Sequence, residues 1–370
     1  MSKLGVRLGY MPQLDGLRAL AIGLVVGYHL GVPLTWGGFL GVDVFLVLSG
    51  FLITSILLGE RLTTGRVRLG RFWWRRVLRL FPALLLMVTV AVVASPVIGR
   101  PGEGDYLMSG FAAVTYTSNL FVSFGAIKLG ALDPTWSLAL EEQFYLVWPI
   151  VLIAVYRFRR KVSFTGRLLA GLGVAATGSF FLMWALFEVR PDGLTPLSYY
   201  RPDARAGGLL LGCMLAVAFV NEAGRRLMER WGRPATWVGL AVLLALVALM
   251  PHNWPQQPVT FGVLIPLASV AAALLIAGLA SSKTLASTAL SSAPAVWVGR
   301  ISYSLYLWHT LVFRATDPFL DGPGGKVLQL VAAVAFATAS YYLVERPFLR
   351  LKDRFEPDVS ERREAQRVTV

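Results

Sequence analysis

The chain has 370 residues, of which 56% are hydrophobic and only 15% are charged, and its formal net charge is +14. A soluble domain carries about 25% charged residues, so this composition excludes an ordinary soluble protein and predicts an all-α polytopic membrane protein. The positive charge does not indicate a nucleic-acid partner, because the Arg residues lie in short loops between apolar segments, where they set topology and bind anionic headgroups. Cys213 is the single cysteine, which leaves no internal disulfide and no thiolate metal cluster.

About ten apolar segments are predicted to cross the membrane as helices. Each approaches the ~20 residues that a membrane-spanning helix needs. In chain order they are 18–35, 39–58, 79–98, 138–156, 168–187, 206–221, 235–250, 260–280, 298–315 and 327–344.

Three connecting stretches carry most of the positive charge: 59–79 has seven Arg and one Glu, 157–167 has five Lys or Arg, and 222–233 has four Arg and two Glu. The positive-inside rule places all three in the cytoplasm, which requires that an eleventh apolar segment, 106–124, does not cross. We therefore expect 106–137 to be a re-entrant or extracytoplasmic element packed inside protein. Both termini are then cytoplasmic, in a cell inner membrane. The alternative is eleven spans with an imperfect charge rule.

Ionisable residues lie within three of the predicted spans. Arg18 begins the first span at its cytoplasmic end, and His29 lies ~16 Å further along the helix. Asp43 lies near the outer end of the second span, and Glu141 and Glu142 lie in the first turn of the fourth. Charges at membrane depth cost about 3 kcal/mol each on insertion scales, so we expect these side chains to share one polar cavity.

Each of these residues also has a structural interpretation. Asp43 is placed to interact with a helix N-terminus, and His29 can serve as an interhelical hydrogen-bonding residue. Of Glu141 and Glu142, which are ~100° apart on a helix, only one is expected to face the cavity. His309, near the middle of the ninth span, is a second histidine within the membrane.

A basic and aromatic stretch, "RLGRFWWRRVLRLFP", occupies 68–82 on the predicted cytoplasmic side. Helical spacing puts Arg71, Arg75 and Arg79 in one row with Arg76 beside it, and guanidinium groups bind phosphate bidentately. The alternative interpretation is anchoring at the membrane surface with an aromatic belt.

Over nearly its whole length the chain resembles the acyltransferase-3 family of integral membrane O-acyltransferases. The family's Arg and His separated by ten residues are matched by Arg18 and His29, and its second-helix sequence by "GVDVFLVLSGFLI". Its Arg-Arg-x-x-Arg pattern is matched at 75–79, and "WSLALEEQFY", "GRISYSLYLWH" and "VERPF" match in the same order. The stretch "RPDARAGGLLLG" is a partial match that contains Arg205. The resemblance implies a single transmembrane domain over 1–348, with 349–370 as a short charged cytoplasmic tail and no fused extracytoplasmic hydrolase-like domain.

The activity that this resemblance implies is transfer of an acyl group, commonly acetyl, from cytoplasmic acyl-CoA to a hydroxyl of a carbohydrate, glycolipid or macrolide-like acceptor. His29 is then the general base, because a neutral imidazole accepts a hydroxyl proton near working pH, or itself a covalent acyl carrier. Other catalytic candidates are Asp43, Glu141 or Glu142 to orient the imidazole and Trp136 or Ser137 to donate to the oxyanion. Candidates that hold the CoA moiety are Arg18, Ser49, Arg75, Arg76 and Arg79. Candidates for substrate or structural support are Arg205, Tyr145, His309 and Glu345.

We expect no metal, and the partners are acyl-CoA, a hydroxyl-bearing acceptor and the lipid bilayer. The competing interpretation is a proton-coupled transporter or exporter of a glycolipid or small molecule. Inverted repeats would support a transporter, and the two halves of the sequence show no self-similarity.

Overall fold

The computed structural model describes residues 10–99, 104–157, 164–189, 195–320 and 322–353. In these ranges the protein is helical, with no strand, and eight helices are long and apolar enough to cross a membrane. This confirms an all-α polytopic membrane protein. Ten long helices occupy the ten predicted segments: α1 (Pro12–His29), α2 (Gly41–Thr64), α3 (Leu69–Ile98), α6 (Thr135–Arg157), α7 (Phe164–Ala185), α8 (Pro202–Val220), α9 (Glu222–Leu249), α10 (Ile265–Ser281), α12 (Ala293–Thr316) and α13 (Gly322–Ser340). The short helices are α4 (Tyr106–Val114), α5 (Ser118–Ser123), α11 (Leu285–Leu290) and α14 (Arg346–Asp353).

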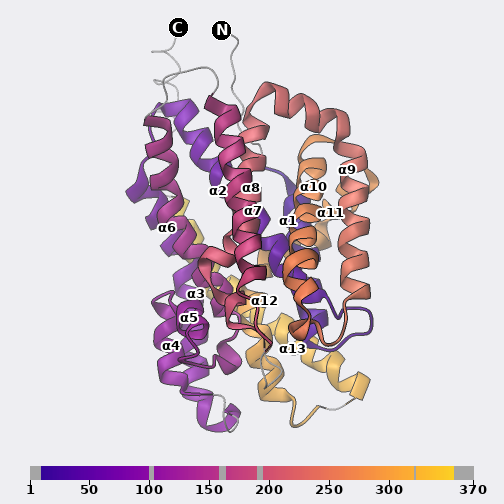
Figure 1. Cartoon of the computed structure of the whole chain (residues 1–370). Coiled ribbons are helices and arrows are strands. Elements are labelled where there is room, and N and C mark those ends of the chain that lie inside the picture. The colour runs from indigo at the N-terminus through magenta and orange to yellow at the C-terminus, as the bar shows by residue number, and fades with distance from the viewer. Residues whose placement is uncertain (1–9, 100–103, 158–163, 190–194, 321, 354–370) are drawn as a thin grey trace.

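Several helix boundaries differ from the predicted segments for local reasons. The first segment was predicted to run to residue 35, but α1 ends at His29, because Gly31 adopts a φ of 62° and Pro33 follows it. The basic stretch before residue 79 is not a loop but the first turns of α3. The basic stretch at 222–233 is likewise the start of α9, which Figure 1 shows crossing above its neighbours before it descends.

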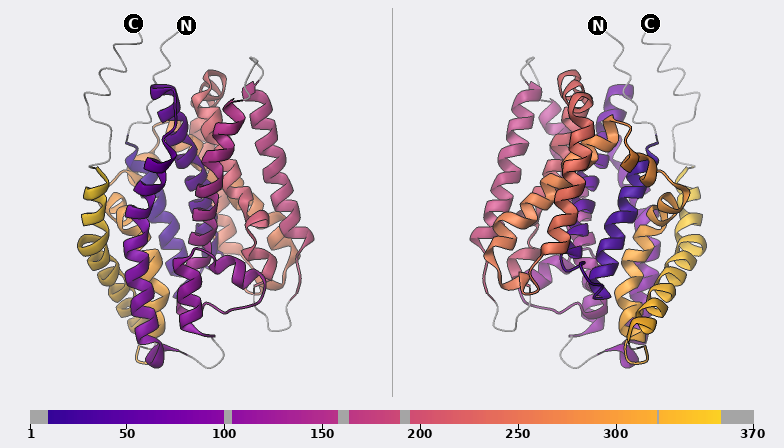
Figure 2. Two further views of the ribbon diagram at one scale, coloured as in Figure 1. Left: turned by 90° about the vertical axis from the view of Figure 1, so that its left-hand side faces the viewer. Right: turned by 90° about the vertical axis from the view of Figure 1, so that its right-hand side faces the viewer.

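The bundle is centred on α2 and α8, whose surfaces are largely buried, whereas α3, α7, α9 and α13 lie at the periphery (Figures 1 and 2). Small residues let α2 and α8 approach closely. A Cβ atom at Gly212 would lie 2.0 Å from the carbonyl oxygen of Val47, and one at Gly50 would lie 2.0 Å from that of Leu209. Such small-residue contacts are a common way for membrane helices to associate.

The segment 106–137 does not cross the bundle. It forms α4, α5 and a 3-10 turn at Gly130–Leu132, near one end of α3 (Figure 1). Ser118 and Asn119 are fully buried, and Asn119 exchanges hydrogen bonds with the side chain of Gln143 on α6, at 2.8 and 3.3 Å. The polar groups of this segment are therefore packed against protein, as the sequence predicted.

The C-terminal end of the described chain passes through a π-helical turn, Tyr341–Glu345, into α14. α14 continues across the domain boundary predicted at 348. The rest of the predicted tail, 354–370, lies outside the described residues.

Candidate active site

A cavity of about 640 Å³, here called the inner chamber, lies at the end of the bundle where α1, α3 and α12 begin. Its wall combines the starts of these helices with the middle of α2, the first half of α6 and the turn that leads into α14. Most of its charged and hydroxyl-bearing side chains come from segments far apart in the sequence: Tyr10, Asp15, Arg18, Ser49, Arg76, Arg79, Tyr116, Ser137, Glu141, Glu142, Tyr145, Arg300, Ser302, Tyr303, Tyr306, Tyr341 and Glu345.

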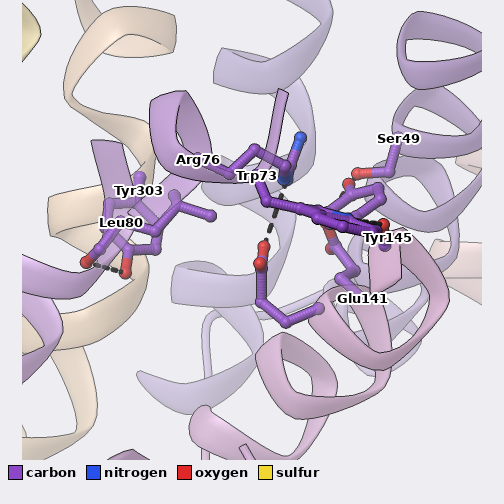
Figure 3. A network of polar contacts seen from close by, with 8 residues as sticks. Ser49, Trp73, Arg76, Leu80, Glu141, Tyr145 and Tyr303 are labelled. Atoms are coloured by element: carbon purple, nitrogen blue, oxygen red, sulfur yellow. Dashed lines mark hydrogen bonds and ion pairs between the residues drawn. The ribbon is translucent and has the colours of Figure 1, made fainter. Parts of the chain in front are cut away.

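One wall of the inner chamber is a hydrogen-bonded group centred on Glu141. Its Oε2 atom accepts a hydrogen bond from Ser49 Oγ at 2.6 Å and another from the Tyr145 hydroxyl at 2.7 Å. Tyr145 lies one helical turn after Glu141 on α6, so the two side chains share a face. Ser49 brings α2 to the same carboxylate (Figure 3).

Arg76 joins α3 to this group. Its guanidinium forms an ion pair with Glu142 at 3.2 Å, and its Cζ atom lies 3.3 Å from the centre of the Tyr145 ring (Figure 3). Trp73, one turn earlier, donates a hydrogen bond from Nε1 to the Tyr145 carbonyl at 3.1 Å. Glu141 and Glu142 both line the chamber, where only one was expected to face the cavity.

Three further guanidinium groups line the inner chamber, and that of Arg300 donates a hydrogen bond to the Tyr10 hydroxyl at 3.3 Å. Arg18 pairs with Asp15 one turn earlier on α1, at 3.1 Å. Arg79 makes no hydrogen bond or ion pair with another described residue, although Glu345, itself hydrogen-bonded by Ser304 at 3.1 Å, lies within its electrostatic range. Of the Arg-Arg-x-x-Arg pattern, Arg76 and Arg79 thus face the chamber, and Arg75 is not among its lining residues.

The far end of the inner chamber is closed by a contact between α6 and α12. The hydroxyl oxygens of Ser137 and Tyr306 are 2.6 Å apart, and both side chains are buried. Tyr306 also contacts the next residue on this face of α12: its ring centre lies 5.7 Å from that of His309, one turn further along the helix.

His29 lies on the other side of this closure and is not among the lining residues of the inner chamber. It is the last residue of α1 and is exposed, its Nδ1 atom bonds the Val25 carbonyl at 2.8 Å, and its ring centre is 4.9 Å from that of His309. The expected single cavity shared by His29, Asp43 and the two glutamates is therefore wrong. The glutamates instead share the chamber with the arginines of α1 and α3.

The side chain of Asp43 points from α2 toward α8 and does not contact His29. Its carboxylate forms an ion pair with Arg205 of α8 at 3.0 Å, and both side chains are 1% exposed. The Arg205 Cζ atom lies 4.4 Å from the centre of the Tyr199 ring and 5.7 Å from that of Trp136. Trp136 thus packs toward α8, away from the chamber that its neighbour Ser137 lines.

Sequence reasoning missed three residues of this region. Tyr303 and Tyr306 line the inner chamber and precede His309 at helical spacing in "SYSLYLWH", which is the signal that would have identified them. Asp133, between the 3-10 turn and α6, is half-buried, and burial raises the pKa of its carboxyl to about 6. Among the described residues no group of three or more His, Cys, Asp or Glu side chains is arranged to hold a metal ion.

Comparison with known proteins gives one family and several relatives. The family model described as "Acyltransferase domain" matches residues 11–346. The chain is 32% identical over 352 residues to "Peptidoglycan O-acetyltransferase OatA" of Listeria monocytogenes, covering 91% of this chain and 56% of that protein. It is 33% identical over 354 residues to "Putative peptidoglycan O-acetyltransferase YrhL" of Bacillus subtilis, covering 91% and 55%.

A "Putative O-acetyltransferase" of Staphylococcus aureus is 31% identical over 360 residues, covering 92% of this chain and 58% of that protein. The chain therefore spans rather more than half the length of the curated relatives that it matches. No solved structure shows a significant match.

Proposed function

The chain belongs to the acyltransferase domain family, and from this premise we propose that it is a membrane O-acyltransferase that transfers an acetyl group from acetyl-CoA to a hydroxyl of a carbohydrate or glycolipid. In this proposal the protein lies in the inner membrane, and both termini and the opening of the inner chamber face the cytoplasm. The observation that carries it is the arrangement of a guanidinium-lined chamber at one end of the bundle and a histidine pair behind its closed end.

The inner chamber suits an acyl-CoA. Its volume of about 640 Å³ lies within the range of pockets that hold a cofactor-sized molecule. Arg18, Arg76 and Arg79 supply guanidinium groups for the phosphates. The thioester arm then points toward Ser137 and Tyr306, whose contact must part for the acyl group to reach His29.

His29 has the tautomer that a general base requires. A carbonyl oxygen only accepts hydrogen bonds, so the Nδ1 atom that bonds the Val25 carbonyl carries the proton and leaves a lone pair on Nε2. In the proposed reaction Nε2 removes the proton of the acceptor hydroxyl, and the oxygen attacks the thioester carbonyl. The Ser137 and Tyr306 hydroxyls, which line the chamber, are the proposed donors to the developing oxyanion, and the CoA thiolate leaves with the proton.

The acceptor is proposed to approach from the side opposite the inner chamber, where His29 is exposed. The relatives' names specify peptidoglycan as the acceptor of those proteins. For this chain we therefore propose a glycan hydroxyl outside the cytoplasm.

The first test uses purified protein in proteoliposomes, labelled acetyl-CoA and a pentamer of N-acetylglucosamine as the acceptor probe. His29→Ala is expected to lower acetyl transfer at least a hundredfold while acetyl-CoA binding persists, because a positioned general base contributes about 10²–10⁴ in rate. Near-normal transfer by this variant would remove His29 from the mechanism.

His252→Ala is the matched control, because His252 lies in the α9–α10 loop with its ring 3.9 Å from that of Trp36. It is expected to retain wild-type transfer. Absence of any acetyl-CoA binding or consumption by the wild-type protein would instead favour the transporter interpretation.

A further inference from the structure

A second cavity, here called the lipid groove, lies between α6 and α7 on the lipid-facing side of the bundle. Its volume is about 580 Å³, and Leu210 of α8 contributes to its lining. One wall is the face of α6 from Phe144 to Val155, and the other is the face of α7 from Arg167 to Ala175. The two helices make little direct contact with each other, so the groove is a gap between them.

α6 and α7 are held apart because each is bonded to a different neighbour. The Ser179 hydroxyl on α7 donates to the Asp203 carbonyl at 2.6 Å and accepts from the Gly207 amide of α8 at 2.9 Å. On α6, Trp148 donates from Nε1 to the Thr54 hydroxyl of α2 at 2.8 Å. Walls that face an empty gap lose van der Waals contacts, so a molecule of the membrane is expected to fill this one.

The groove is apolar along its length and basic at one end. Of its lining side chains only Trp148 and Arg167 carry polar atoms, and the indole N–H is already engaged. Arg167 is exposed and makes no hydrogen bond or ion pair with another described residue. Arg157, the last residue of α6, is also exposed and lies at this end, because α6 ends and α7 begins at the end of the bundle where α1 begins (Figure 2).

The length of the groove matches one leaflet of a membrane. From Phe144 to Val155 the wall on α6 rises ~16 Å. The hydrocarbon core of a bilayer is about 30 Å thick, so this wall spans about half of it. A lipid whose acyl chain lies in the groove therefore places its headgroup at Arg167.

We propose that the lipid groove binds one anionic glycerophospholipid, with an acyl chain between α6 and α7 and its phosphate on Arg167. Basic pockets between membrane helices bind anionic headgroups, and a guanidinium matches the geometry of a phosphate. The proposal does not depend on the acyl-transfer activity, because the groove shares no lining residue with the inner chamber.

The bound lipid would support the outer side of the chamber wall. Phe144 lines the groove with its ring stacked on that of Trp148, the centres 5.6 Å apart. Glu142 and Tyr145, two neighbours of Phe144 on the same helix, line the inner chamber. An occupied groove thus fixes the position of α6 from the side opposite its carboxylates.

The test measures the lipid that the purified full chain retains, by native mass spectrometry, after transfer from vesicles of equal phosphatidylglycerol and phosphatidylcholine. The wild type is expected to retain one phosphatidylglycerol, at least tenfold more often than phosphatidylcholine. Arg167→Gln is expected to reduce this preference about tenfold, because the charge-assisted contact with the phosphate is lost. Gly171→Leu is expected to abolish retention, because Gly171 lines the groove and a Cβ there meets no atom within 4 Å, which leaves the new side chain free to occupy the space.

Two matched variants control for effects outside the groove. Gly178→Leu introduces the same side chain on the same helix, where a Cβ also meets no atom within 4 Å, but Gly178 does not line the groove. Arg233→Gln removes another exposed arginine, on α9. Both are expected to retain phosphatidylglycerol as the wild type does. Replacing glycine by leucine favours a helix, so both glycine variants are expected to fold.

Thermal unfolding in detergent provides a second readout that does not require mass spectrometry. A ligand that binds only the folded protein raises its apparent stability. Added phosphatidylglycerol is therefore expected to raise the unfolding temperature of the wild type and of Gly178→Leu, and to leave that of Gly171→Leu unchanged. An equal rise in all three would overturn the proposal.

Other occupants of the groove give different results, and each would overturn the proposal. Equal retention of both phospholipids would indicate unselective lipid contact, and displacement by glycerol 3-phosphate would indicate a phosphate site that does not use the groove. Preferential retention of a polyprenyl phosphate would assign the groove to a lipid-linked glycan carrier. A dimer that Gly171→Leu dissociates would assign it to a second copy of the chain.

Discussion

Arg79 is distinguished at the residue scale by the absence of a close partner. Two of the other guanidinium groups expected to bind the donor line the chamber and are already paired, Arg18 with Asp15 and Arg76 with Glu142. Arg79 lines the same chamber and makes no hydrogen bond or ion pair with another described residue. A cation at this position is electrostatically uncompensated at short range, and a phosphate group of the donor would supply the missing partner.

Arg79→Ala is therefore expected to raise the KM for acetyl-CoA about 10- to 100-fold with a smaller change in kcat. This corresponds to loss of one charge-assisted hydrogen bond, about 1.5–3 kcal/mol. Initial rates of acetyl transfer against acetyl-CoA concentration measure the effect. An unchanged KM would show that Arg79 does not bind the donor and would leave it only the role of orienting α3 in the membrane.

Two other arginines on α3 sharpen the comparison. Arg71→Ala is the control and is expected to leave KM unchanged, because Arg71 does not line the chamber. Arg75 tests whether the sequence motif or the structure predicts the binding residues better. The motif groups Arg75 with Arg76 and Arg79, but of these three only Arg76 and Arg79 line the chamber. Arg75→Ala is expected to raise KM less than Arg79→Ala, and the reverse order would contradict the geometric assignment.

At the scale of secondary-structure elements, α2 and α8 are joined by close backbone packing and by one buried ion pair. Gly50 and Gly212 allow the two backbones to touch, and Asp43 and Arg205 face each other nearby at 3.0 Å. Both charges are out of water, so each depends on the other for compensation. This assigns the pair to holding the central helices together, in place of the expected role of Asp43 beside His29.

Arg205→Ala is expected to lower the free energy of unfolding by about 3–5 kcal/mol, because it leaves the Asp43 carboxylate buried without its partner. The double variant Asp43→Leu with Arg205→Met is expected to recover most of this loss, since no buried charge remains. Thermal unfolding in detergent, followed by the exposure of buried Cys213, measures both. A single variant that is inactive yet as stable as the wild type would instead indicate a direct role in the reaction.

The elements could be predicted from sequence more fully than their contacts. Apolar length and charge identify the ten long helices, because crossing a bilayer is a constraint on each segment separately. Predicting the direction in which a side chain points also requires knowing which helices lie next to it. His29 lies at the C-terminal end of α1 and Asp43 in the first turn of α2, but Asp43 turns to α8 and His29 to α12. Depth along a helix does not determine which helix a side chain faces.

On the scale of the whole molecule, the polar groups proposed to take part in the reaction occupy two regions along the bundle, apart from the buried pair of Asp43 and Arg205. The inner chamber collects the carboxylates and guanidinium groups at the end where α1 begins, and the histidine pair lies beyond the contact of Ser137 with Tyr306. This division suits a reaction with a donor on one side of a membrane and an acceptor on the other. It has that meaning only if the two ends of the bundle lie in different compartments.

Two exposed positions at opposite ends of the bundle test this orientation. Phe124 follows α5 in the segment predicted to be extracytoplasmic, and Leu285 begins α11, which packs against Gly16 near the start of α1. Both side chains are 79% exposed. Cys213 is fully buried and its replacement by Ala provides a cysteine-free background.

In intact cells, a membrane-impermeant maleimide is expected to label Phe124→Cys and to leave Leu285→Cys unlabelled, because the basic stretches in the first turns of α3 and α9 are expected to hold the Leu285 end in the cytoplasm. Inside-out vesicles should reverse the pattern, and detergent should expose both positions equally. Labelling of Leu285→Cys in intact cells would place the mouth of the inner chamber outside the cytoplasm. A cytosolic acyl-CoA could then not enter it, and the donor assignment would fail even if acetyl transfer were observed.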